Sequence, residues 1–229
     1  MNRIFTSITF ILLIGITTGC KDEEPEGENK NVWAYHRLVY DADTDKTYAR
    51  TTFRYDNMDG QAFELVPMAS ITFNGEPLNW SSADSFHETQ LDGLVESGTF
   101  TYTASDGNTY SNTIEVPSPI GFPPELDSLF VDETYVLNWT GDVLEEDERV
   151  QLTLSAENTS GVEQEFTAQD EGEASVELTE DHLDNLGTGT TDMHMQKVFV
   201  PVDFDAPPGG GILESRYEAE SNLDITVSQ

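Results

Sequence analysis

Three scarcities define this sequence: it has one cysteine, ten Lys and Arg residues, and no apolar run long enough to cross a bilayer. With Cys20 as its only cysteine, the chain cannot form an internal disulfide, so its stability must come from packing. The ten basic residues stand against 44 acidic ones, a net charge of −34 at pH 7. Repulsion of that sign makes nucleic acid and anionic lipid headgroups poor partners, so we expect no nucleic-acid binding. The longest apolar stretch, Ile8 to Ile16, is shorter than the roughly 20 residues of a membrane-spanning helix.

The excess of carboxylates favours cations or a basic protein surface as binding partners. The alternative is a solvation role, in which the carboxylates keep the protein soluble in salty water where screening acts beyond about 8 Å. The scarcity of lysine fits an acidic, salt-exposed surface, so we favour the solvation role.

Motifs that carry catalysis are also missing. We find no Gly-x-Ser-x-Gly elbow, phosphate-binding loop or cysteine nucleophile, and the four histidines lack zinc-ligand spacing. Carboxylate pairs are too numerous for any one pair to indicate a glycosidase. We therefore predict that the protein is not an enzyme and requires no cofactor.

The N-terminus has the parts of a secretory signal. Arg3 precedes the apolar stretch, and Thr17-Thr18-Gly19 leads into Cys20. This segment resembles the lipobox of bacterial lipoproteins, although Thr17 stands where that family usually has an aliphatic residue. The resemblance implies that residues 1–19 are cleaved and that Cys20 carries acyl chains such as palmitate, which anchor the protein to a membrane. The alternative is a signal peptide without lipidation.

The residues after Cys20 indicate where the anchor is displayed. Lys21-Asp22-Glu23-Glu24 resembles the export signal of surface lipoproteins of the Bacteroidota. The resemblance implies display on the outer face of the outer membrane, with a periplasm-facing anchor as the alternative. Residues 20–31 are charged and almost free of apolar side chains, so we expect a flexible acidic tether.

Beyond the tether, period-2 alternation predicts strands nearly throughout. The clearest hairpin joins residues 98–104 to 109–116 through Ser105-Asp106-Gly107-Asn108, which suits the positive φ of a tight turn. Four prolines between Pro117 and Pro124 predict a boundary. The second half repeats the pattern, with one or two helical turns after Thr179 as N-cap, a strand from Val198 to Phe204 and a flexible segment at 207–211.

These patterns predict an all-β protein with two tandem antiparallel β-sandwich domains, at residues 32–118 and 119–229. This pattern of short strands and turns resembles the Ig-like modules of bacterial surface lipoproteins. The Cys-Trp-Cys core of true Ig domains is absent, so the sequence leaves the strand topology open.

An acidic loop is the candidate metal site. Asp41, Asp43 and Asp45 have the one-three-five spacing of calcium-binding loops, but Lys46 and Thr52 replace the Gly and Glu that an EF-hand needs. Either a looser calcium site or an acidic hairpin turn fits this sequence. The acidic turn at residues 56–60 would converge on the same ion if the flanking strands pair.

Two short motifs indicate other chemistry. Asp127-Ser128-Leu129 resembles the O-glycosylation acceptor of exported Bacteroidota proteins, with Ser128 as the acceptor. Met193-His194-Met195 has ligands that suit Cu(I), but on a strand His194 faces away from both methionines, so we expect a packed strand.

Aromatic side chains are the candidate ligand-binding residues, since exposed rings bind the CH surfaces of sugars. Trp80 follows a strand in a polar segment and is the first choice, and Trp33 with Tyr35 on one strand face is the second. The alternative is that all three tryptophans pack in cores, which we expect for Trp139.

Three classes of function remain open. The first is a non-catalytic surface lipoprotein that binds a glycan or a protein for adhesion or nutrient capture. The second is a structural or accessory subunit of an outer-membrane assembly, and the third is a divalent-cation binder or calcium-stabilised spacer.

Overall fold

The computed structural model describes residues 31–156 and 162–227. The predicted lipidation site Cys20, the export signal at 21–24 and nearly all of the tether lie outside the described residues. Within them the chain is almost entirely strand, with one short helix, α1 (Glu180–Leu186). Among these residues no helix is long and apolar enough to span a membrane.

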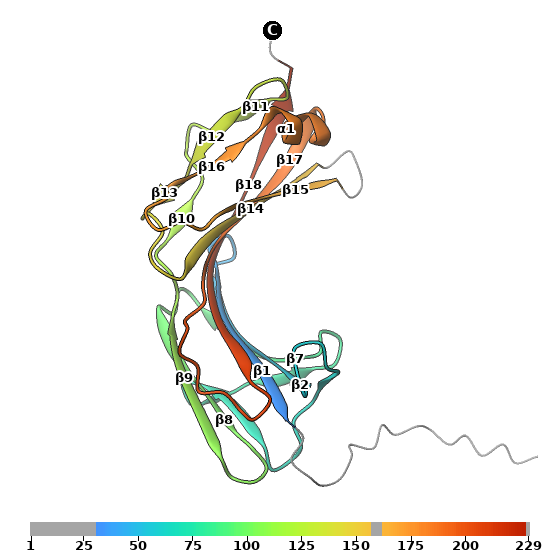
Figure 1. Ribbon diagram of the computed structural model, residues 1–229, viewed down its shortest axis with the longest axis vertical. Coiled ribbons are helices and arrows are strands. Elements are labelled where there is room, and N and C mark those ends of the chain that lie inside the picture. The colour runs from blue at the N-terminus through green and yellow to red at the C-terminus, as the bar shows by residue number, and fades with distance from the viewer. Residues whose placement is uncertain (1–30, 157–161, 228–229) are drawn as a thin grey trace, which may run out of the picture.

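One sheet of ten strands runs the length of the molecule (Figure 1). Its main path follows the order β15-β14-β17-β18-β1-β2-β7-β6, while β11 pairs with β18 and β3 pairs with β2. The bounds of these strands are β1 (Val32–Asp41), β2 (Lys46–Tyr55), β3 (Ala62–Phe63), β6 (Asn79–Ser81), β7 (Phe86–Asp92), β11 (Ser128–Phe130), β14 (Glu148–Ala156), β15 (Glu163–Ala168), β17 (Gly189–Phe199) and β18 (Gly211–Thr226).

The last strand, β18, joins the two halves of this sheet. It pairs in parallel with β1, from Ala34 opposite Gly211 to Asp41 opposite Glu218. Its other edge pairs antiparallel with the whole of β17, from Ser215 opposite Phe199 to Ile225 opposite Gly189. The first and last strands of the described chain are therefore neighbours at the centre of the sheet.

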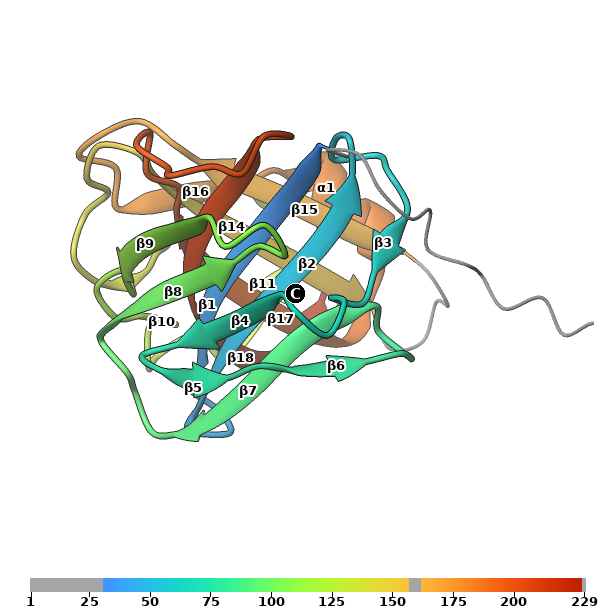
Figure 2. The same cartoon turned by 90° about the horizontal axis from the view of Figure 1, so that it is seen from below.

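The N-terminal lobe is closed by a second sheet of four strands, in the order β5-β4-β8-β9. These strands are β4 (Ser70–Phe73), β5 (Glu76–Pro77), β8 (Ser97–Thr103) and β9 (Thr109–Glu115), and Figure 2 shows them stacked over β1 and β2. Phe53, Phe73 and Phe100 are the largest apolar side chains of the core between the two sheets. The predicted β8–β9 hairpin is confirmed, with Gly107 at φ 88° in its turn.

The C-terminal lobe is covered by two short strand pairs and the helix. The pairs are β10 (Ile120–Gly121) with β13 (Thr140–Gly141) and β12 (Tyr135–Asn138) with β16 (Ser175–Leu178). Leu183 and Leu186 of α1 pack into this lobe's core with Leu137 of β12, Leu152 of β14 and other side chains of β14 and β17.

Both cores lie against the same face of the ten-stranded sheet. Along β18 the odd-numbered positions point inward, so Leu213 packs in the N-terminal core while Leu223 and Ile225 pack in the C-terminal core. Among residues 31–156 and 162–227, no layer of strands or helix covers the opposite face. The molecule bends into a C shape, and this uncovered face lies on the concave side (Figure 1).

The all-β, sandwich-like fold is confirmed. The division into domains at 32–118 and 119–229 stays a prediction, and strand periodicity did not indicate that β18 would enter both cores. That arrangement depends on pairing between residues about 180 positions apart, which leaves no local trace in a sequence.

The predicted strand from Val198 to Phe204 is wrong beyond Phe199. β17 ends at Phe199, and the side chain of Val202 is 83% exposed. The chain leaves the sheet because Asp205 bonds instead to β9: its amide donates to Asn112 Oδ1 (2.7 Å) and its carbonyl accepts from Asn112 Nδ2 (3.0 Å).

The segment at 207–211, predicted to be flexible, is held against β1. Gly209 donates to the carbonyl of Val32 (2.9 Å), and Gly210 accepts from the amide of Ala34 (3.1 Å). A Cβ on Gly211 would lie 2.2 Å from the Ala34 carbonyl oxygen, so this close approach of two backbones requires glycine.

The predicted helix after Thr179 is present, but its capping bond is not. Thr179 occupies the N-cap with extended backbone, yet its hydroxyl bonds to His182 Nδ1 (2.7 Å) instead of a backbone amide. The nearby imidazole competes for the hydroxyl, and no signal in the sequence separates the two partners.

Candidate functional site

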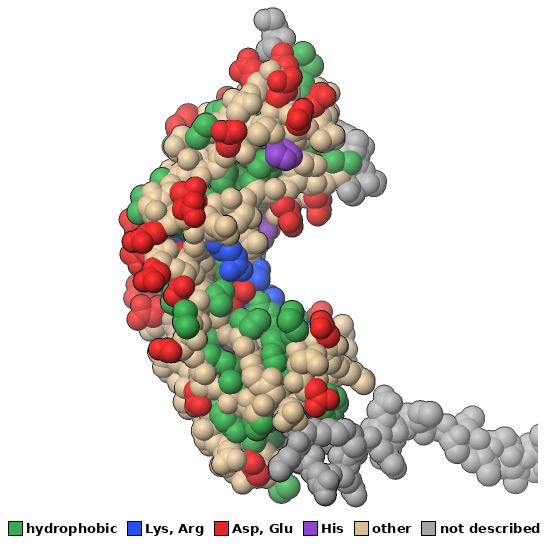
Figure 3. Space-filling model, viewed as in Figure 1, with side chains coloured by type: hydrophobic (Ala, Val, Ile, Leu, Met, Phe, Trp, Pro, Cys, Tyr) green, Lys and Arg blue, Asp and Glu red, His purple; other side chains and the backbone are tan. Residues whose placement is uncertain are grey.

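The uncovered face of the ten-stranded sheet, which we call the open face, is the candidate site. The register places odd-numbered residues of β1 and β14 on it, together with even-numbered residues of β2, β7, β17 and β18. Side chains of two lobes and of segments far apart in sequence therefore share one surface. Figure 3 shows this surface as a hollow between the lobes.

Nearly all the basic side chains of the described chain lie on the open face. Seven of the ten Lys and Arg residues fall in the described ranges, and only Lys197 faces the cores. Lys and Arg side chains gather where the molecule is narrowest, whereas Asp and Glu cover much of the rest (Figure 3). The six on the open face are Arg37, Lys46, Arg50, Arg54, Arg149 and Arg216. We call the part of the open face that carries Arg37, Arg50, Arg149 and Arg216 the waist.

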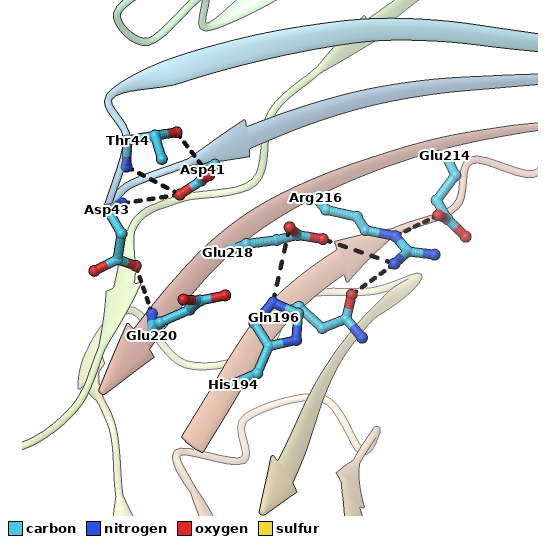
Figure 4. Close-up of polar contacts among 9 residues, drawn as sticks. All are labelled: Asp41, Asp43, Thr44, His194, Gln196, Glu214, Arg216, Glu218 and Glu220. Carbon is cyan, nitrogen blue, oxygen red and sulfur yellow. Dashed lines mark hydrogen bonds and ion pairs between the residues drawn. The ribbon is translucent and has the colours of Figure 1, made fainter. Parts of the chain in front are cut away.

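A nearly buried carboxylate organises one side of this waist. Glu214, 5% exposed, accepts hydrogen bonds from the Tyr35 hydroxyl (2.8 Å) and from Arg216 Nε (2.5 Å). Arg149 lies 3.7 Å from the same carboxylate. Arg216 also donates to Gln196 Oε1 (2.7 Å) and lies 3.8 Å from Glu218, as Figure 4 shows.

On the other side of the waist, Arg50 lies among aromatic rings. Its guanidinium is 4.6 Å from the Tyr48 ring centroid and 5.3 Å from that of Phe86, and it pairs with Glu88 at 2.5 Å. Both rings are partly exposed. The guanidinium is thus attracted to the faces of both rings by cation–π interaction, which stabilises their packing.

Arg37 is the basic residue of the waist without a carboxylate partner. Its guanidinium stacks 4.9 Å from the Tyr35 ring centroid, and within the described ranges it forms no ion pair. Partial burial lowers the pKa of Arg37, and the positive charges of Arg216 and Arg50 act in the same direction, against Tyr35 and Glu214. Among the described residues, Arg37 is therefore the one cation of the waist that forms no ion pair; Arg54, farther along β2, donates to the Gly60 carbonyl (2.8 Å).

Toward the C-terminal lobe the open face becomes acidic. A hollow of about 510 Å³ is lined by Asp43, Asp192, His194 and Glu220, together with Ser155, Met193, Ser221 and Asn222. The Glu218 carboxylate, 3.7 Å from His194 Nε2, raises the pKa of that imidazole, although partial burial opposes the shift. The face thus has a basic waist and an acidic end.

The predicted calcium loop does not bring its carboxylates together. Asp41 accepts bonds from the amides of Asp43 and Thr44 and from the Thr44 hydroxyl, Asp45 accepts from the Tyr40 hydroxyl, and Asp43 accepts from the amide of Glu220. Figure 4 shows the carboxylates of Asp41 and Asp43 on these different partners. The loop is a hairpin turn between β1 and β2 in which each carboxylate holds backbone or a hydroxyl.

The second acidic turn, at residues 56–60, lies at the opposite end of β2. Ten strand residues separate the turns by about 30 Å, so the prediction that both converge on one ion is wrong. In residues 31–156 and 162–227, no group of three or more His, Cys, Asp or Glu side chains is arranged to hold a metal ion.

The predicted aromatic residues lie on opposite faces of the sheet. Trp80 is in edge strand β6 instead of a loop, in register with His87, and its ring packs 4.9 Å from that imidazole on the covered side. Trp33 and Tyr35 lie on the open face with ring centroids 6.1 Å apart, although Trp33 is only 8% exposed. Trp139 packs in the C-terminal core, as predicted.

The remaining predicted residues lie apart from the open face's waist. Ser128 is half-buried in β11, where its hydroxyl donates to Asp127 at 3.2 Å. Met193 and Met195 are buried in the core, and His194 points to the open face, so the packed-strand interpretation is confirmed.

Sequence reasoning missed the arginines. Their signal was available: in a chain with few basic residues, Arg37 alternates in phase with Trp33 and Tyr35, and Arg50 with Tyr48. The alternation of residues along one strand does not show which strands pair, and it is this pairing that places Arg37 and Arg50 beside Arg149 and Arg216.

Comparisons with known proteins yield structural likeness only. No protein-family model and no curated protein matches the sequence. A similar solved structure comes from work on host cell surface retention of a 1.5-MDa bacterial ice-binding adhesin. The match has 15% identity and a TM-score of 0.27, and covers 88% of this chain and 67% of that one.

Proposed function

We propose that the protein is a non-catalytic lipoprotein, anchored through Cys20 at the surface of the outer membrane, whose open face binds a glycan or a protein in adhesion or nutrient capture. One observation carries the binding role. Four arginines, Arg37, Arg50, Arg149 and Arg216, lie with the partly exposed rings of Tyr35, Tyr48 and Phe86 on one concave sheet face that no other described element covers.

Two features of this face support a binding role. Its side chains stand on paired strands and are cross-linked by ion pairs, so little order is lost when a ligand binds. It is also hollowed between two lobes, which allows a ligand to contact both (Figure 3). Trp80, facing the other side, is not part of this proposed site.

A binding array with the full-length protein tests the proposal. We expect saturable binding to a glycan or a protein, weakened about tenfold or more by Tyr48→Ala, which removes an exposed ring and the support of Arg50. Trp80→Ala is the matched aromatic control and should bind normally. Binding that Tyr48→Ala leaves intact would place the ligand elsewhere.

The anchor has a separate test. We expect the wild-type protein to sediment with outer membranes and to incorporate labelled palmitate, and Cys20→Ala to lose both properties. Sedimentation of Cys20→Ala with membranes would contradict lipid anchoring.

A further inference from the structure

The charge balance of the waist leaves one cation unmatched. Three of its guanidiniums have protein carboxylates: Arg50 pairs with Glu88, Arg216 with Glu214 and Glu218, and Arg149 with Glu214. Within the part of the chain that the structure describes, Arg37 forms no ion pair and its guanidinium stacks on the Tyr35 ring. Glu214, the nearest carboxylate in register, already accepts from Tyr35 and Arg216.

The register adds a repulsive pair. Arg37 and Arg50 lie directly opposite each other on β1 and β2. Like charges in directly opposite positions destabilise a sheet. The fold keeps this arrangement in a chain with a net charge of −34, where carboxylates are abundant. An anion bound between the two guanidiniums would relieve the repulsion.

We propose that the open face binds an acidic polysaccharide and that Arg37 binds one of its carboxylate or sulfate groups. This inference rests on the proposed function of the open face as a binding surface. The planar guanidinium fork matches either oxyanion in a bidentate manner. Tyr48 and Phe86 next to Arg50 offer rings for the apolar faces of neighbouring sugars. Gln196 and Gln151 extend the polar surface into the C-terminal lobe.

The surface chemistry favours a polysaccharide over an acidic protein. Protein interfaces centre on well-buried apolar anchors. Of the large apolar side chains that are most exposed in the described chain, Phe130 lies in a strand of the ten-stranded sheet, in register with Thr226 at the end of the C-terminal lobe and away from Arg37. The others lie outside the strands of that sheet: Met58, Met68, Leu94, Val136, Val143, Val202 and Val227. A repeating chain of charged sugars requires no such anchor.

Binding of four polymers to the full-length protein tests this proposal: polygalacturonate, dextran sulfate, neutral dextran and poly-glutamate. We expect saturable binding of polygalacturonate, dextran sulfate or both, and the preferred polymer distinguishes carboxylate from sulfate recognition. Neutral dextran should bind at least about tenfold more weakly, because it offers Arg37 no charged hydrogen-bonding partner. Poly-glutamate has carboxylates but no sugar rings to pack on Tyr48 and Phe86, so it should also bind more weakly than the acidic polysaccharide.

Two variants with the same change of charge locate the anion. Arg37→Gln should weaken binding of the acidic polysaccharide about tenfold or more. Arg54→Gln, on the same strand pair but bonded to the carbonyl of Gly60, should change it less than about twofold. Thermal melting checks that both variants are folded.

The outcomes separate this inference from the proposed function. Equal affinity for neutral dextran, lost in Tyr48→Ala, would overturn the acidic ligand and leave the binding face in place. Preference for poly-glutamate would overturn a polysaccharide in favour of an acidic protein. Unchanged affinity of Arg37→Gln for the acidic polysaccharide would overturn the role of Arg37. If none of the four polymers binds, the inference is wrong, and the binding array still tests whether the open face binds another ligand.

Discussion

On β1, adjacent residues meet two different environments. Leu38 is fully buried in the N-terminal core, whereas Arg37 lies on the open face beside three other arginines. The same contrast holds along β17, where Met195 is buried and Gln196 bonds to Arg216. One face of the sheet stabilises the fold by packing in the two cores, and the other face carries charged side chains.

The histidines show the same contrast. His36 on the covered face is 1% exposed, stacks 5.0 Å from Phe100 and bonds to the Thr51 hydroxyl at 2.8 Å. Burial lowers its pKa to about 3. His194 on the open face has a raised pKa because of Glu218. The covered face thus keeps histidine neutral, while the open face favours its charged form.

The largest expected effect is on the covered face. Phe100→Ala should lower the free energy of unfolding by about 4 kcal/mol, because it removes a fully buried ring that packs on Phe73 and His36. Urea unfolding measures the loss. Phe130→Ala, at a ring that is 37% exposed, is the control and should cost about 1 kcal/mol or less. Equal losses would contradict the assignment of the core.

Next in size is the ion pair beneath the waist. Lys197, fully buried, lies 2.9 Å from Glu148 and donates to the Ser118 hydroxyl at 2.9 Å. Glu148→Gln should destabilise the protein by about 3 kcal/mol, because it leaves a buried ammonium without a counter-charge. Glu146→Gln makes the same chemical change at an exposed position and should have little effect in the same unfolding experiment.

Acidification should lower the free energy of unfolding by a smaller amount, through the buried His36 on the covered face. His36 has a lower pKa folded than unfolded, so its contribution is complete above its ordinary pKa of 6.5 and is lost as the pH falls toward about 3. Between pH 7 and pH 5 the linkage amounts to about 2 kcal/mol.

Comparison of wild type with His36→Gln isolates this contribution from the carboxylates. The variant should be less stable at pH 7 but should show a shallower loss on acidification. Identical pH slopes in the two proteins would show that His36 does not carry the effect.

The smallest effect is expected on the open face. Gln151→Ala should change the free energy of unfolding by less than about 0.5 kcal/mol, since its side chain packs in neither core. Thermal or urea unfolding decides this. A loss of several kcal/mol would show that the open face is itself structural, and would weaken the comparison on which the binding site rests.

Much of the local structure could be predicted from sequence. Alternation predicted the β8–β9 hairpin, the inward Trp139 and the opposed directions of His194 and its two methionines. These follow from the period of a strand, which depends only on neighbouring residues. The position of Trp80 could not be predicted from alternation, because its place in β6 and its packing on His87 depend on pairing with a second strand.

The candidate site was not predictable in the same way. The spacing of Asp41, Asp43 and Asp45 suggested a cation site, but a spacing does not say which donors the oxygens meet. In the folded chain those donors are an amide of β18 and neighbouring turn groups. The lipoprotein features at Cys20 and residues 21–24 rest on the sequence alone.

By itself the sequence determined the strand content, the acidic surface and the two-sided strands, because composition and period are local properties. Only the tertiary structure decided that β18 pairs with β1 and brings Arg216 and Arg149 beside Arg37 and Arg50. Such pairing is selected by the burial of two whole cores against one face of the sheet. The gathering of cations on the other face is a consequence of that choice.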